Sequence, residues 1–153
     1  IRQSLITLLL VAFTLMAACV VLHAVGLPFA MRWLERSIAG LGFSYGRQLR
    51  LLIAVAGWTV IVHLVEITVW AVYFAASGAM PDIDSALYFS AVTYTTTGYG
   101  DLVLPERWRL VGGVEALTGI LMCGWSTGFF FAVFSQILLK DAGNVGPVRT
   151  SRG

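Results

Sequence analysis

Charged side chains are scarce in this sequence. Asp, Glu, Lys and Arg make up 12% of its 153 residues, about half of the ~25% that is usual in soluble globular domains. The mean hydropathy of +0.84 argues against a soluble enzyme or a disordered tail and indicates a protein embedded in a lipid bilayer. The net charge of +2 is too small for a nucleic-acid partner, and the length suits one domain.

Catalytic and metal-binding patterns are also missing. The two cysteines, Cys19 and Cys123, lie in separate apolar runs and lack metal-ligand spacing. The sequence has no glycine-rich phosphate loop with a lysine, no His/Cys cluster and no paired nucleophile and base. It therefore predicts a protein that is not an enzyme and that uses no cofactor and no organic substrate.

Three apolar runs are each long enough to span a membrane. The core of the first, residues 4–27, is about 36 Å long as a helix, and the hydrocarbon of a bilayer is ~30 Å thick. His63 and Glu66 interrupt the second run, and Glu115 interrupts the third. We expect an all-α membrane protein with transmembrane helices over residues 1–27, 51–76 and 108–139.

A secretory signal peptide is the alternative for the first run. The residues Met16-Ala17-Ala18-Cys19 resemble a lipoprotein cleavage site. The apolar run continues past Cys19, however, whereas the core of a signal peptide spans only ~7–15 residues. An uncleaved transmembrane helix is therefore expected.

A shorter segment, residues 84–96, lies between the second and third runs. It is about 20 Å long as a helix, which is too short to cross, yet it is too apolar for an ordinary loop. Such a segment survives at membrane depth only when it is buried in protein or lines water. We expect a re-entrant helix.

The distribution of charge predicts the orientation. Basic residues dominate the 28–50 linker and the 140–153 tail, whereas acidic residues dominate 77–109. Positively charged loops stay inside, so we expect both the linker and the C-terminus to be cytoplasmic and the N-terminus to lie outside. Phe29, Trp33 and Ile38 indicate a short interfacial helix in the linker, with a plain polar connector as the alternative.

A glycine-containing string follows the re-entrant helix: Thr95-Thr96-Thr97-Gly98-Tyr99-Gly100-Asp101. A dehydrated cation needs oxygen ligands, which successive main-chain carbonyls supply if all of them point at one axis. That arrangement requires left-handed residues at alternate positions, and glycine adopts this conformation without steric cost. The negative end of the preceding helix dipole also favours a cation.

At these residues the chain resembles the pore-loop potassium channels, whose filter reads TVGYG. The match is Thr96-Thr97-Gly98-Tyr99-Gly100 followed by Asp101, within a pore domain of residues 51–139. The resemblance is to a small prokaryotic member with one extra helix before the pore, in a prokaryotic cytoplasmic membrane. It implies that K⁺ is the permeant ion and is coordinated by the carbonyls of residues 96–99 and the Thr96 hydroxyl. One chain supplies one filter loop, so the resemblance also implies a fourfold homotetramer.

The resemblance further implies a support behind the filter. Asp101 would accept a hydrogen bond from Tyr88, and the ring of Tyr99 would pack on Tyr88 and Phe89. Glu66 and Glu115 lie at membrane depth, where a charge costs at least ~2.5–3.5 kcal/mol. We expect both to bond pore-helix hydroxyls such as Ser90 or Thr93, with a purely structural hydrogen bond as the alternative.

The inner helix offers candidates for gating. The resemblance places a hinge at Gly119 or Gly124, although close helix packing is the alternative for these glycines. Helical spacing from Gly119 puts Ile120, Cys123 and Thr127 toward a central cavity. Phe131 would form a hydrophobic gate, unless it only faces lipid and neighbouring helices.

His63 lies one turn before Glu66 on the same helix face and is a candidate pH sensor, or else a neutral hydrogen-bonding group. The sequence thus leaves three functions to compare. The leading one is a potassium channel. The others are a weakly selective Na⁺/K⁺ channel, suggested by Thr97 where the family has Val or Ile, and a pore-like subunit that does not conduct.

Overall fold

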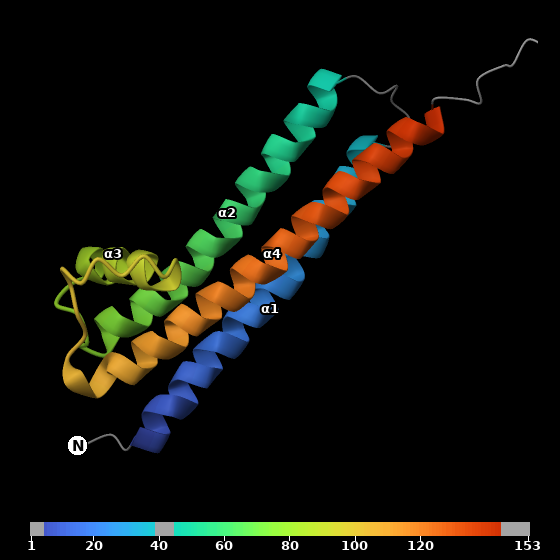
Figure 1. The fold of residues 1–153 in the computed structure, drawn as a ribbon. Coiled ribbons are helices and arrows are strands. Elements are labelled where there is room, and N and C mark those ends of the chain that lie inside the picture. Colours follow the sequence, from blue (N-terminus) through green and yellow to red (C-terminus); the bar gives the residue numbers. More distant parts are fainter. Residues whose placement is uncertain (1–4, 39–44, 145–153) are drawn as a thin grey trace, which may run out of the picture.

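The computed structural model describes residues 5–38 and 45–144. These residues contain helices and no strand, and three of the helices are long and apolar enough to cross a membrane (Figure 1). In chain order the elements are α1 (Leu5–Ile38), α2 (Tyr45–Ala76), α3 (Ile83–Tyr94), the 3-10 helix η1 (Glu106–Trp108) and α4 (Arg109–Asn144). The expected all-α membrane fold is confirmed, while the fourfold assembly stays a prediction.

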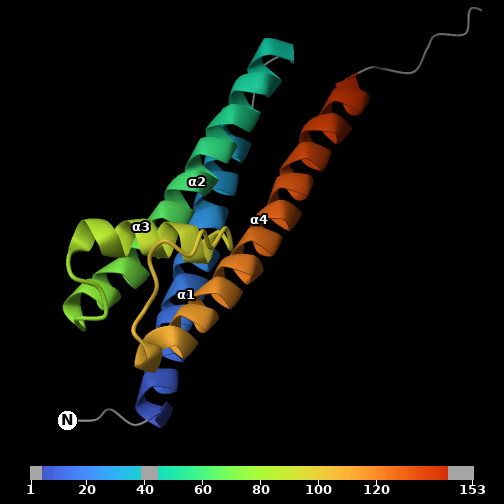
Figure 2. The ribbon, with the colours of Figure 1, turned by 60° about the vertical axis from the view of Figure 1, so that its left-hand side comes forward.

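Helix α3 is the expected short helix. Its 12 residues give a length of about 18 Å, well below the ~30 Å of the hydrocarbon. Figures 1 and 2 show it lying across the long helices near one end of the bundle, beside α2. Asp82 caps its start by accepting the Ser85 amide N–H at 2.7 Å. The helix ends at Tyr94, two positions earlier than expected.

An aromatic core holds α3 against α2. Trp70 and Phe74 of α2 are fully buried, and Phe74 meets Phe89 of α3 edge-on with ring centroids 5.5 Å apart. Within a bilayer such contacts stabilise the fold through close van der Waals packing. The segment that follows α3 therefore starts from a firmly held point. At the opposite end of the bundle a smaller cluster joins α2 to α4, made of Leu51, Val55, Val133 and Ile137.

The helix boundaries at the linker differ from those expected. Helix α1 continues past residue 27 to Ile38, so no separate interfacial helix is present there. Pro28 removes one helical hydrogen bond but does not end the helix, because α1 is packed on α2 at this point. The Trp58 indole N–H donates to the Gly26 carbonyl at 2.9 Å, and a Cβ on Gly26 would lie 2.8 Å from Val62 Cγ2.

The other long helices are also longer than expected. Helix α2 begins at Tyr45 rather than at residue 51, and α4 runs on to Asn144 rather than ending at 139. The remainder of the linker, 39–44, and of the tail, 145–153, lies outside the described residues.

Candidate functional site

The loop after α3 has an alternating backbone. Thr96, Gly98 and Gly100 have φ values of 59°, 54° and 78°, and Thr96 is the one non-glycine residue with positive φ in the described chain. Glycine adopts this conformation freely, whereas for threonine it costs on the order of 1–3 kcal/mol. Strain of this kind persists where the surrounding structure imposes it and is typical of functional sites.

Helix α3 sets the direction of the loop's peptide groups. The amide N–H groups of Thr97 and Gly98 both donate to the Val92 carbonyl, at 2.9 and 3.2 Å. No described peptide bond is cis, and in a trans peptide the carbonyl points away from the amide N–H. The Thr96 and Thr97 carbonyls therefore point away from α3, on the exposed face of the subunit.

The threonine side chains behind the loop are tied to α3. The Thr97 hydroxyl is 3.0 Å from the Thr95 hydroxyl, which in turn donates to the Ala91 carbonyl at 2.7 Å. The oxygen of Thr97 thus belongs to a hydrogen-bonded chain that ends on the helix.

Asp101 is held at the outer end of the loop. The Tyr88 hydroxyl donates to its Oδ2 at 2.6 Å, which is the hydrogen bond expected from the sequence. This bond keeps the pKa of Asp101 below its ordinary value. Tyr99 is 72% exposed in the single subunit and Phe89 packs in the core against Phe74, so the packing of Tyr99 on Tyr88 and Phe89 stays a prediction for the assembled protein.

Gly119 lies where α4 passes the end of α3. A Cβ at this position would lie 1.8 Å from the Tyr94 carbonyl oxygen, a separation that no side chain tolerates. Close packing against α3 therefore explains Gly119 directly. A hinge at this position stays a prediction.

The remaining candidates on α4 share one open face. A Cβ at Gly124 would meet nothing within 4 Å, and Phe131 is 73% exposed. The three cavity candidates, Ile120, Cys123 and Thr127, are exposed as well. Within a single subunit the predicted cavity and gate residues thus lie on an unoccupied face of α4.

Glu66 joins residues from all four α-helices. Its carboxylate accepts hydrogen bonds from Tyr94 of α3 and from His23 Nδ1 of α1, the latter at 2.9 Å. His63 Nδ1 lies 3.4 Å from the same carboxylate. The Oγ of Ser126 on α4 is 3.0 Å from Nε2 of both histidines. We call these five residues the histidine–glutamate cluster. Glu66 thus meets a hydroxyl of α3, as expected, but the hydroxyl is that of Tyr94 rather than that of Ser90 or Thr93.

Glu115 does not make the expected bond either. Its carboxylate is fully buried, and neither of its oxygens has a hydrogen-bond partner among the described residues. The hydroxyl of Ser90 is likewise buried and has no hydrogen-bond partner among the described residues.

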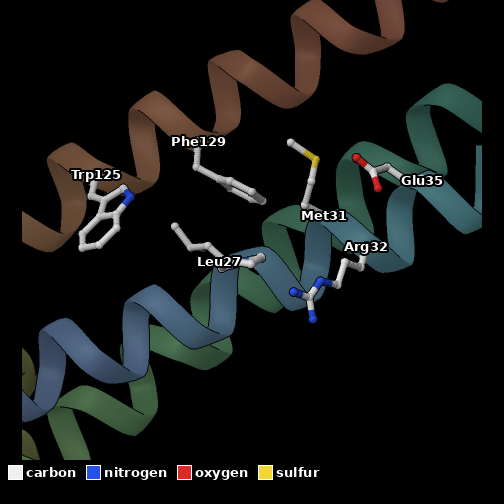
Figure 3. Close-up of a pocket in the computed structure, with 7 residues that line it drawn as sticks. Leu27, Met31, Arg32, Glu35, Trp125 and Phe129 are labelled. Carbon is white, nitrogen blue, oxygen red and sulfur yellow. The ribbon is translucent and has the colours of Figure 1, made fainter.

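A groove of about 430 Å³ lies between α1 and α4, farther from α3. In Figure 3 the side chains of Met31 and Phe129 point toward each other across it. Leu27 and Trp125 line it as well, with Arg32 and Glu35 on the same stretch of α1. Helix α4 is thus loosely packed against α1 here, in contrast to its tight contact with Tyr94.

Sequence reasoning missed parts of this site. Nothing in the sequence links His23 or Ser126 to Glu66, because the three residues lie in separate apolar runs and meet only after folding. The left-handed Thr96 was also missed, because the argument from glycine covers only Gly98 and Gly100.

The comparisons with known proteins give one match. A family model described as "Ion channel" matches residues 60–136, half of the chain. The matched range covers most of α2, all of α3, the 96–100 loop and most of α4. No curated protein and no solved structure matches the chain significantly.

Proposed function

The chain belongs to this ion-channel family, within the pore-loop potassium channel superfamily, and from that premise we propose that it is a potassium-selective channel. It is a multi-pass membrane protein. In our proposal K⁺ passes down its electrochemical gradient between main-chain oxygens of residues 96–99, with the C-terminus in the cytoplasm and the N-terminus outside.

The observation that carries this proposal is the alternating loop. Left-handed residues occur at 96, 98 and 100. The amides of Thr97 and Gly98 are turned back to α3, which leaves the carbonyls of Thr96 and Thr97 free on the opposite side. Carbonyls arranged in this way replace the hydration shell of a potassium ion. The C-terminal end of α3 lies beside them, and the negative end of the helix dipole there favours a cation.

The proposal also requires four subunits. A single loop surrounds an ion on one side only, and cyclic symmetry is the usual way to close a ring of identical chains. The exposed face of α4, with Ile120, Cys123 and Thr127, would then line the cavity below the filter. A homotetramer accounts for this apolar exposure without other partners.

Ion flux through the purified protein in liposomes tests the function. We expect a barium-sensitive K⁺ flux and, with K⁺ and Na⁺ on opposite sides, a reversal potential near that of K⁺. An absence of flux from correctly assembled protein would favour the non-conducting subunit instead.

A weakly selective Na⁺/K⁺ channel is the second candidate, because Thr97 stands where the family has Val or Ile. Its hydroxyl bonds Thr95 at 3.0 Å, and this bond supports a stiff filter rather than a loose one. Thr97→Val restores the usual family residue and provides the matched comparison. A selectivity for K⁺ that rises strongly in Thr97→Val would support the second candidate, whereas an unchanged selectivity would support the first.

A further inference from the structure

The histidine–glutamate cluster contains an unusual set of donors for the interior of a membrane protein. His23 and Glu66 are fully buried, His63 is 17% exposed, and the ligand atoms of the three all lie within 4.8 Å of one another. Ionisable groups at this depth are costly and point to a function by default. None of the three side chains belongs to the 96–100 loop that is proposed to conduct ions.

The hydrogen bonds of the cluster do not balance if both histidines are neutral. A carboxylate only accepts, so His23 Nδ1, 2.9 Å from Glu66 Oε1, must carry a proton. The Tyr94 hydroxyl uses its hydrogen in the bond that it donates to Glu66. His63 Nδ1 lies 3.1 Å from that hydroxyl, so it must carry a proton and donate it to the hydroxyl oxygen.

The imbalance appears at Ser126. With both protons on Nδ1, each neutral ring turns a lone pair at Nε2 toward the Ser126 hydroxyl. Both of these Nε2···Oγ distances are 3.0 Å, but the hydroxyl has a single proton to donate. One of the two contacts is therefore left without a hydrogen unless a cation, either an extra proton or a metal ion, joins the cluster.

We propose that this cluster is a binding site for a divalent transition metal of the zinc class, held by Nδ1 of His23, Nδ1 of His63 and the carboxylate of Glu66. Both ring protons then sit on Nε2, and both donate to the two lone pairs of Ser126. Metal-bound histidines commonly donate their second ring N–H in this manner. The cation also compensates the charge of Glu66.

The distances suit such an ion. Zinc binds His nitrogen and carboxylate oxygen at ~2.0–2.2 Å, which places tetrahedral ligands about 3.4 Å apart. The two nitrogen–carboxylate separations are 2.9 Å and 3.4 Å, so shifts of a few tenths of an ångström make room. The spacing of His63 and Glu66, three residues apart on one helix, is also found in helix-bundle metal sites. The partial exposure of His63 offers a route of entry.

A metal here would fasten the helices together. The ligands come from α1 and α2, Ser126 from α4, and Tyr94 is the last residue of α3 before the filter loop. Because an ion that binds the folded state stabilises it by mass action, occupancy should raise thermal stability.

Metal analysis of the purified, tag-free, EDTA-stripped protein tests the proposal. After incubation with ZnCl₂ and removal of free metal, we expect one zinc per subunit by elemental analysis, a rise of several degrees in melting temperature, and the visible spectrum of tetrahedral Co²⁺ with cobalt. His63→Gln and Glu66→Gln should abolish all three responses, and Ser126→Ala should weaken binding by about 10–100-fold.

Cys123→Ser is the matched control, because it removes the exposed thiol and leaves the cluster intact. It should bind zinc as the wild type does. The proposal would be overturned if the wild type retained no more zinc than Glu66→Gln does. An extra proton shared by the two histidines would then complete the hydrogen bonds to Ser126 instead. Loss of binding in Cys123→Ser would overturn it as well. The wild-type measurement alone decides the matter if a cluster variant fails to fold.

Discussion

The two faces of α4 use glycine for different reasons. On the face toward α3, a Cβ on Gly119 would lie 1.8 Å from the Tyr94 carbonyl oxygen, whereas a Cβ on Gly124 would meet nothing within 4 Å. The first glycine is needed because α4 rests on the last residue of α3. The second lies on the open face of α4, which we assign to the cavity. The packed face is therefore fixed against α3, and the open face is available to line a pore.

The largest expected effect comes from Gly119→Ala. Overpacking of this kind typically costs about 1–3 kcal/mol, and here the obstacle is backbone that also carries the filter loop. We expect tetramer yield and K⁺ flux to fall below detection. Gly124→Ala is the matched control and should assemble normally by size-exclusion chromatography. Equal assembly and flux in the two variants would remove the contrast between the packed and the open face of α4.

Phe131→Ala tests the open face of α4. The side chain is 73% exposed in the subunit, and four copies would close the pore by dewetting. We expect a severalfold rise in open probability in single-channel recordings. Phe134→Ala, which removes a half-exposed phenylalanine on the same stretch of α4, serves as the control. A current that is unchanged or reduced would exclude Phe131 from the gate.

Tyr88→Phe tests the attachment of the 96–101 loop to α3 more gently. It removes the 2.6 Å hydrogen bond to Asp101 but leaves the ring in place, so we expect a severalfold loss of K⁺ over Na⁺ selectivity with normal assembly. Tyr73→Phe removes a hydroxyl from α2 instead and should change nothing. Selectivity equal to wild type in Tyr88→Phe would show that Asp101 holds its place without Tyr88.

The same bond predicts a pH dependence with a definite sign. The hydrogen bond from Tyr88 lowers the pKa of Asp101 in the folded state. The stabilisation that the ionised Asp101 gives the loop is therefore complete above the ordinary carboxyl pKa of about 3.9. It is lost as the pH falls below that value, through the lowered pKa. We expect the Asp101-dependent selectivity to hold through neutral and mildly acidic pH and to fall only in stronger acid, measured against Asp101→Asn. A loss near pH 6 would contradict this origin.

The smallest effect is expected at Glu115. Its buried carboxyl has no hydrogen-bond partner in the described residues, whereas Glu66 has two. Glu115→Gln should therefore keep the conductance, the selectivity and the melting temperature of the wild type, and Glu66→Gln should lower the melting temperature of metal-free protein. A strong loss of selectivity in Glu115→Gln would restore Glu115 as a brace for the filter.

The sequence predicts what depends on neighbours along the chain. The long apolar runs give the three spanning helices, and Gly98 and Gly100 predict the left-handed positions of the 96–100 loop. The Tyr88–Asp101 bond was expected from the resemblance to the potassium channels, and the structure contains it. Contacts between distant segments escape such reasoning. Gly119 meets Tyr94 only when α4 crosses α3, and His23, Glu66 and Ser126 come from three different helices. The end of α1 was misplaced because packing on α2 lets the helix continue through Pro28.

A density map of the purified protein in lipid nanodiscs tests the central claim most directly. The account predicts four subunits around one axis, with the carbonyls of residues 96–99 facing it and cation density between them in K⁺. Subunits that share no axis, or a 96–100 segment that faces solvent away from any pore, would contradict it.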